Sequence, residues 1–438
     1  LALAGERLGE HARETVERAL ARTQGWPAGT ALLLRTAAAP AAGHDALGAA
    51  AGGAFASEQA LYDYLAAEVF EHLAPELREF ALDCSVLDVL TPEACAAVSG
   101  VADARARLRT LYRLDTFVVA LDANGPVLRF HDLFRDFLRA RLQATAPERV
   151  ADRHARAATA VGDPAAALSH WAAAGRWDEF VVRLLRESEA LLAVGGPASL
   201  ERWLARVPTV DGPFAADLHY LRGLAAWRRW DWLNSRAHLE RAVATEEAAG
   251  RAPRAVILLP LMGSLNGLGE REAAEALGER LAALPLGDAD RAALALQQAW
   301  CAMAAGRPDR VLASFHGFVA LAARDPARLC PRTAYRAHTA YVGIPGMLAH
   351  YEAYVRTCRT VEGDAAAPWH AAPRLMEAWI HLWRGERAAC ERALAEADEL
   401  RRRFGGIAPI EDAAARVGAL YAALTGRPAG RELCWSLV

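Results

Sequence analysis

Apolar residues return every three or four positions along most of this chain, and that spacing is typical of amphipathic helices. Residues 1–35 fit two helices separated by a break at 25–29. An Ala-, Gly- and Pro-rich run follows over residues 36–55, which favours a linker. From Ser57 the pattern sharpens, because a leucine or valine recurs at every fourth residue. These residues are Leu61, Leu65, Val69 and Leu73.

Capping and breaking residues predict the helices that follow. Pro75 stands where a second helix would begin. Thr91-Pro92-Glu93 combines a capping hydroxyl, a first-turn proline and an acid beside the positive end of the helix dipole, so it predicts a helix start. Gly100 is expected to end that short helix. A further helix runs through Leu108 and Leu111.

One β signal interrupts the helical pattern. Two apolar runs, 117–121 and 127–130, flank a loop that contains Asn124-Gly125, which is typical of a hairpin. His131-Asp132 then opens a closing helix. Three helices, a hairpin and a closing helix predict a winged-helix domain. The apolar residues of the closing helix are Leu133, Phe134, Phe137, Leu138 and Leu142.

Helix pairs joined by short polar turns recur beyond residue 146. Six turn residues follow one another at intervals of 39, 37, 40, 39 and 41 residues. Such a period predicts stacked helical hairpins of the tetratricopeptide type, slightly longer than the usual unit of about 34 residues. The stack would form an α-solenoid with a concave face. The turn residues are Trp230, Gly269, Gly306, Gly346, Gly385 and Gly426.

Composition agrees with a mainly α fold and narrows the chemistry. At 438 residues the chain exceeds one core, so several domains or a domain plus an array are expected. Its net charge of −3 gives no basic surplus for nucleic acid. All cationic side chains are arginines, which excludes a Schiff-base or phosphate-loop lysine. The seven scattered cysteines favour a reducing cytoplasm, and no apolar run reaches transmembrane length.

Particular stretches resemble a known family. Residues 62–65, 77–80 and 84–87 resemble the winged-helix part of the large ATP-dependent activators typified by the maltose-regulon activator, which belong to the STAND class of signalling NTPases. The segment around His131-Asp132 is the most specific, because it resembles the Met-His-Asp motif of STAND proteins with Phe130 in the Met position. The resemblance covers about residues 20–245 and continues as generic repeats.

The resemblance implies a nucleotide-sensing role for a few residues. Family members carry a P-loop NTPase module before these parts and an effector domain, often a LuxR-type helix-turn-helix, after them. No P-loop motif occurs here, so the chain is expected to be a fragment, and ATP or ADP is expected only in the intact parent protein. There His131 and Asp132 would sense the terminal phosphate of ADP, while Gly25 and Pro27 would lie at the adenine. The alternatives are a capped helix start with a core histidine and a plain helix break.

Aromatic residues of the array form the second candidate site. On a concave surface they would hold a sugar or another small inducer, and helix-packing core is the alternative. The candidates are Trp227, Trp230, Trp300, Tyr335, Tyr341, Trp379 and Trp383.

Two further charge patterns have a functional and a plain interpretation. Arg105, Arg107, Arg109 and Arg113 would face DNA if the winged helix bound it, but a solvated or packed face is preferred. Paired acids such as Glu246-Glu247 are interpreted as solvated charge. The sequence contains no nucleophile elbow, no zinc-protease motif and no metal-ligand spacing, so no motif in it indicates an enzyme.

These patterns predict a domain order and a function. Residues 1–55 would be the last helices of a nucleotide-binding module with a linker, 56–145 the winged helix, 146–210 connecting helical pairs, and 211–438 the superhelical repeats. The expected function is signal sensing in a cytoplasmic STAND-type transcriptional regulator. The array would bind a small inducer or regulatory protein, without direct nucleic acid or membrane binding, and oligomerisation of the parent on activation is left open. A passive protein-binding scaffold is the alternative.

Overall fold

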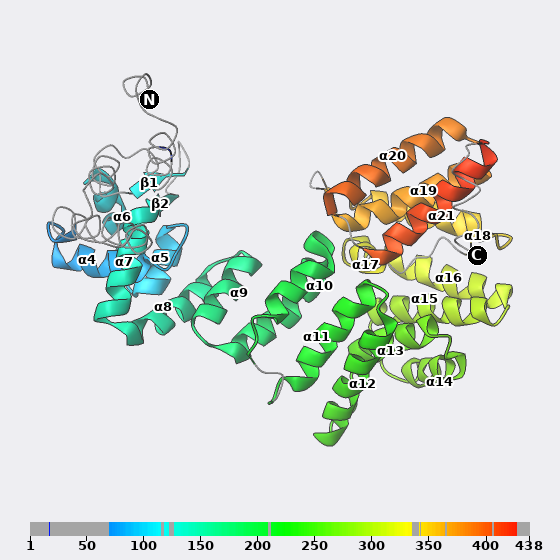
Figure 1. Cartoon of the computed structure of the whole chain (residues 1–438), viewed down its shortest axis with the longest axis horizontal. Helices are drawn as coiled ribbons and strands as arrows, with labels where there is room; N and C mark the ends of the chain where they lie inside the picture. Colours follow the sequence, from blue (N-terminus) through cyan, green and yellow to red (C-terminus); the bar gives the residue numbers. More distant parts are fainter. Residues whose placement is uncertain are drawn as a thin grey trace, which may run out of the picture. The chain divides into compact units, whose positions relative to one another are not determined.

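The computed structural model describes residues 17, 70–114, 118–121, 127–208, 212–334, 341, 343–363, 366–404 and 407–426. The chain divides into two compact units, residues 1–177 and 178–438 (Figure 1), which we describe separately. This division falls within the predicted connecting segment 146–210, and the three predicted domain boundaries stay predictions. Most of the predicted helix over 61–73 lies outside the described residues, which resume at residue 70. The predicted break at 25–29 also lies outside them.

The first unit has the predicted winged-helix order of helices, hairpin and closing helix. Thr91 caps its helix, because its hydroxyl accepts a hydrogen bond from the Ala94 amide at 3.2 Å, and Gly100 ends it at φ 75°. Both local predictions are confirmed. The elements are α4 (Pro75–Cys84), α5 (Pro92–Ser99), α6 (Ala104–Arg113), β1 (Val118–Ala120), β2 (Leu128–Phe130), α7 (Asp132–Thr145), α8 (Pro147–Ala160) and α9 (Pro164–Ala173).

The two strands pair antiparallel, with Val118 opposite Phe130. Leu90 adds a single bridge to Leu128, with its amide 2.7 Å from the Leu128 carbonyl oxygen. Sequence analysis missed this bridge, because one residue between two helices carries no alternating pattern. The buried side chains of β1, β2 and α4–α7 share one apolar core, so the hairpin is anchored to the helices by packing.

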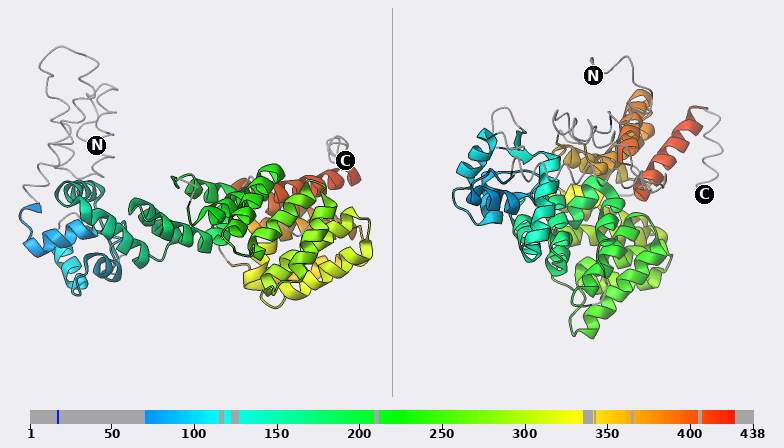
Figure 2. Two further views of the ribbon diagram at one scale, coloured as in Figure 1. Left: turned by 90° about the horizontal axis from the view of Figure 1, so that it is seen from below. Right: turned by 60° about the vertical axis from the view of Figure 1, so that its left-hand side comes forward.

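The second unit consists of helical hairpins with α10 before them. Neighbouring helices from α11 to α16 lie side by side (Figure 2). The helices are α10 (Trp177–Leu204), α11 (Ala215–Arg228), α12 (Trp232–Ala248), α13 (Ala255–Gly267), α14 (Arg271–Ala282), α15 (Asp288–Ala304), α16 (Pro308–Ala322), α17 (Pro326–Thr333), α18 (Met347–Arg359), α19 (Ala371–Trp383), α20 (Arg387–Phe404) and α21 (Ala408–Leu424), with a 3₁₀ turn at Pro368–His370.

All six predicted turn residues have left-handed backbone conformations, with φ between 58° and 88°. This conformation reverses the chain at the end of a helix, and glycine adopts it without steric cost. Four of the residues lie inside the hairpins α11–α12, α13–α14, α15–α16 and α19–α20. Gly346 instead caps the start of α18, after the short helix α17, so the fourth repeat departs from the regular pattern. The predicted helical-hairpin repeat is otherwise confirmed.

Close helix contacts depend on small residues. A Cβ at Gly223 of α11 would lie 2.6 Å from Leu239 of α12, and one at Gly267 of α13 would lie 2.5 Å from the Trp232 ring. Longer side chains at either glycine would push the paired helices apart. None of the helices in the described part of the chain is long and apolar enough to cross a membrane.

Candidate functional sites

His131 is the residue that joins the hairpin to the closing helix. It caps α7, is 8% exposed, and its Nδ1 accepts a hydrogen bond from the Leu133 amide at 3.4 Å. A neutral imidazole that accepts at Nδ1 carries its proton on Nε2. The first amides of α7 add a partial positive charge, which favours an anion at this helix start.

An arginine network holds the helix start in place. Asp132 pairs with Arg135 at 3.2 Å and with Arg129 at 3.8 Å. Arg139, one turn further along α7, donates to the carbonyl oxygens of Ser85 and Val86 at 2.8 and 2.9 Å. Burial, reinforced by the charge of Arg135, lowers the pKa of Arg139. The start of α7 is therefore tied to the segment after α4.

Sequence analysis singled out His131 and Asp132 in this region but missed Asp88. Asp88 accepts from both Arg135 and Arg139, at 3.0 and 3.3 Å. Its partners lie 47 and 51 positions away in sequence, so no local signal marks it. Gly25 and Pro27, the other predicted nucleotide-sensing residues, lie outside the described residues.

Three of the predicted aromatic ligand residues come together around Trp232, a further aromatic residue of the array. Trp230 stacks on Trp232 with ring centroids 5.8 Å apart, while Trp227 and Trp300 approach it edge-on at 6.0 and 5.9 Å. Trp227 is 2% exposed, so its indole is part of the helix packing, whereas Trp230 and Trp300 are half-buried. The cluster sits where α11, α13 and α15 end.

The remaining predicted aromatics lie elsewhere. Tyr341 is buried, with its ring 6.3 Å from that of Phe315, and burial raises its pKa. Trp379 and Trp383 share one face of α19, but the first is 8% exposed and the second, at the helix end, is 57% exposed. Tyr335 lies outside the described residues. The structure thus spreads the predicted set over separate places.

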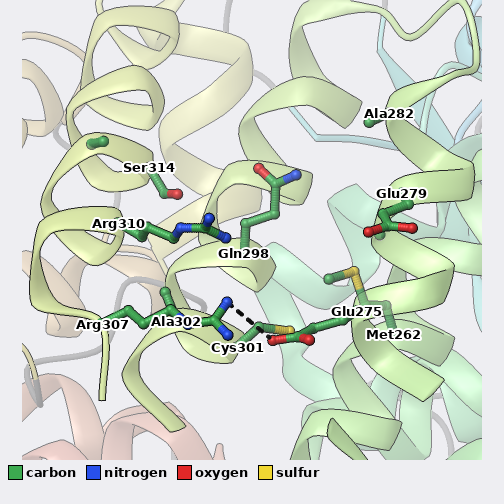
Figure 3. A pocket seen from close by; sticks show the side chains of 12 residues that line it. Met262, Glu275, Glu279, Ala282, Gln298, Cys301, Ala302, Arg307, Arg310 and Ser314 are labelled. Atoms are coloured by element: carbon green, nitrogen blue, oxygen red, sulfur yellow. Dashed lines mark ion pairs between the residues drawn. The ribbon is translucent and has the colours of Figure 1, made fainter. Parts of the chain in front are cut away.

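A pocket of about 380 Å³ opens between α14 and α16, with α13 and α15 beneath it (Figure 3). Glutamates line the α14 wall and arginines line the α16 wall. Arg307 reaches Glu275 at 4.0 Å, while Arg310 and Gln298 project into the space. No aromatic residue lines it, so sequence analysis passed over it. The lining is Met262, Glu275, Gly278, Glu279, Ala282, Gln298, Cys301, Ala302, Arg307, Arg310, Ala313 and Ser314.

The face shared by α11, α13 and α15 offers much less space. A hollow of about 20 Å³ there is closed by Glu189 of α10 and Arg332 of α17, whose charged atoms are 3.9 Å apart. Glu189 also pairs with the buried Arg228 at 3.2 Å. That volume holds about one water molecule. The pocket between α14 and α16 is therefore much roomier than this hollow.

Two charge predictions can be placed. Arg107 packs on α4, donating to the Glu76 carbonyl oxygen at 2.9 Å, while Arg105, Arg109 and Arg113 are exposed. The interpretation of Glu246 as solvated charge is wrong. It is 2% exposed and accepts from the backbone amide and the Nε of Arg254 at 2.9 and 2.5 Å. This carboxylate closes the connection between α12 and α13, which sequence spacing does not reveal.

Comparison with known proteins locates the family likeness in the first unit. Residues 66–150 match the family model of the MalT winged helix domain. The HTH-type transcriptional regulator MalT of Vibrio cholerae is 38% identical over 100 residues, which are 23% of this chain and 11% of that protein. MalT of Serratia proteamaculans is 34% identical over 151 residues, 34% of this chain and 17% of its own length.

A relative with a different name matches at a similar level. The serine/threonine-protein kinase PknK of Mycobacterium tuberculosis is 30% identical over 172 residues, 36% of this chain and 15% of that protein. The matched regions thus span less than a fifth of the length of each of these relatives. Residues 66–150 are thus similar to the winged helix domain of the MalT-type transcriptional regulators, and helical hairpins follow this part of the chain.

Proposed function

We propose that this chain is the signal-sensing segment of a STAND-type transcriptional regulator. In the proposal, the helical array binds a small inducer or a regulatory protein, and the winged helix relays that binding to a nucleotide-binding module of the intact protein. The relay requires a ligand that prefers one arrangement of the regulator over another. We assign no catalytic activity to the chain itself.

The position of His131 carries this proposal. The buried His131 caps the start of α7, and the partial positive charge at a helix start favours an anion there. In the intact protein the imidazole of His131 would contact the terminal phosphate of ADP in the resting state. Asp132, with its arginine partners, would fix the orientation of the helix start.

The relay is tested in the full-length regulator. Replacing His131 by Ala is expected to speed ADP dissociation and raise basal transcription, because the phosphate loses a hydrogen-bond partner in a buried site. His72→Ala, at an exposed histidine of the same unit, is the control. An ADP dissociation rate that His131→Ala leaves unchanged would rule out the role given to this residue.

The rival function is a passive scaffold that binds only proteins. Thermal-shift screening of the chain against small metabolites separates the two functions, because a scaffold would not be stabilised by any of them. A second rival is DNA binding through the exposed arginines of α6. It requires a gel shift at low salt that Arg105→Ala and Arg109→Ala abolish.

A further inference from the structure

We propose that the pocket between α14 and α16 binds a small zwitterion, such as a free amino acid. Its carboxylate would lie on Arg307 and Arg310, and its ammonium group on Glu275 and Glu279. This inference rests on the proposed sensing function, since the zwitterion would be the inducer of the array.

Arginines on one wall of the pocket face glutamates on the other, and the two walls are joined by one long ion pair. At one end, Arg307 and Glu275 just meet at 4.0 Å. One turn further along the same two helices, Arg310 and Glu279 line opposite walls (Figure 3) and form no ion pair with each other among the described residues. A molecule that carries both charges can fill the gap between these walls and satisfy both at once.

The charge balance of the walls selects among ligand classes. Two arginines and two glutamates make the pocket neutral at pH 7, so a dianion or a diamine would leave one wall facing a like charge. Sugars and nucleobases usually stack on aromatic rings, and the lining contains none. A zwitterion matches both walls.

The floor and the volume limit the size of the ligand. Met262, Ala302 and Ala313 provide an apolar surface for one short side chain, while Gln298 and Ser314 offer neutral hydrogen bonds. The volume of about 380 Å³ lies at the small end of known ligand pockets. Cys301 donates to Asn266 Oδ1 at 3.0 Å, and burial raises the pKa of its thiol. The thiol therefore serves as packing, and binding is expected to be non-covalent.

The test uses free amino acids as probes, each with its N-acetylated and its carboxamide derivative. Calorimetry on the whole chain is expected to give binding for at least one amino acid and much weaker binding for both derivatives. Arg310→Ala and Glu279→Ala should each weaken binding about tenfold or more, since each removes a charged partner. Both residues are exposed, so the fold should survive, and circular dichroism checks this. Arg271→Ala, an exposed arginine at the start of α14 outside the pocket, is the matched control.

Combining the two ligand derivatives with the two protein variants, as in a double-mutant cycle, shows which charge of the ligand each residue contacts. Arg310→Ala should add no further loss to the carboxamide, and Glu279→Ala none to the N-acetyl derivative, because in each case the missing contact is the same. Independent losses would overturn the assigned orientation. If amino acids bind to both variants as tightly as to the unchanged chain, the proposal that they bind in this pocket is wrong.

The remaining outcomes separate this inference from the proposed function. If only metabolites of another class stabilise the chain, the ligand class is wrong while sensing by the array stands. If no small molecule stabilises it, both the zwitterion and the small-inducer form of the proposed function are wrong.

Discussion

Single turn residues set the spacing of the helical hairpins. Gly269, Gly306, Gly385 and Gly426 occupy left-handed conformations with no neighbouring atom within 4 Å of an added Cβ. Their importance is therefore conformational and does not come from close packing. Trp230 occupies the same conformation without being glycine, with φ 58°, and its ring stacks on Trp232. Ring packing offsets the backbone strain at that turn.

The turn glycines give a direct test of this distinction. Gly385→Ala is expected to lower the free energy of unfolding by about 1 kcal/mol, because alanine disfavours φ 72°. Gly317→Ala is the matched control, since its site is equally open but lies inside α16. There alanine should stabilise by about 0.5–1 kcal/mol. Urea unfolding measures both, and shifts of the same sign would contradict the argument.

Pairs of elements are held by buried charge as well as by apolar contacts. In the first unit, Asp83 of α4 is 5% exposed and meets Arg149 at 2.5 Å and Arg153 at 2.8 Å, both on α8. A buried carboxylate with two arginine partners is costly to break, since the arginines would lose their counter-charge. These two ion pairs fix the position of α8, the first helix after the winged helix, relative to α4.

Removing this charge should cost far more than removing an exposed one nearby. Asp83→Asn is expected to destabilise the first unit by about 3 kcal/mol. Glu79→Gln removes a 59% exposed partner of Arg149 and should cost less than about 1 kcal/mol. Chemical denaturation followed by circular dichroism compares the two. Equal losses would mean that burial of Asp83 contributes little.

The contact between α8 and α9 predicts a pH dependence. His154 and His170 approach with their Nδ1 atoms 2.9 Å apart. Burial, with the charge of His170 next, lowers the pKa of His154 to about 4, and burial also lowers the pKa of His170. Arg139 opposes protonation of both rings and Asp88 favours it.

The sign follows from comparing the folded and unfolded states. The unfolded chain binds protons near pH 6.5 while folded His154 stays neutral to about pH 4, so stability is full above 6.5 and falls as the pH drops to 4. His154→Gln should flatten this slope, whereas His72→Gln at an exposed site should not. Unfolding midpoints measured across this range test it, and an unchanged slope in His154→Gln would contradict the assignment.

At the scale of the whole molecule, the chain divides into two compact units, each with its own buried apolar residues. Units with separate cores usually unfold in separate steps. Asp83→Asn is therefore expected to lower the unfolding midpoint of the first unit only, and Gly385→Ala that of the array only. Hydrogen exchange read out by mass spectrometry distinguishes the units. Coincident shifts of both units with either variant would show that they unfold together.

Much of the architecture was determined by the sequence itself, because it rests on local rules. The cap at Thr91, the end at Gly100 and the hairpin before His131 involve residues only a few positions apart. The six turn residues are equally local, so their spacing predicted helical hairpins before any packing was known. The family likeness likewise rests on a continuous stretch, residues 66–150.

Tertiary structure decided the features that join distant positions. Asp88 accepts hydrogen bonds from arginines that are 47 and 51 residues away in sequence. Glu246 is bound by Arg254, which lies beyond its own helix. The walls of the α14–α16 pocket come from separate hairpins, so no local pattern shows that their charged residues face one another. Sequence analysis therefore proposed the aromatic residues of the array as the ligand site instead. Periodicity fixes which face of a helix is apolar, but which partner covers that face depends on long-range packing.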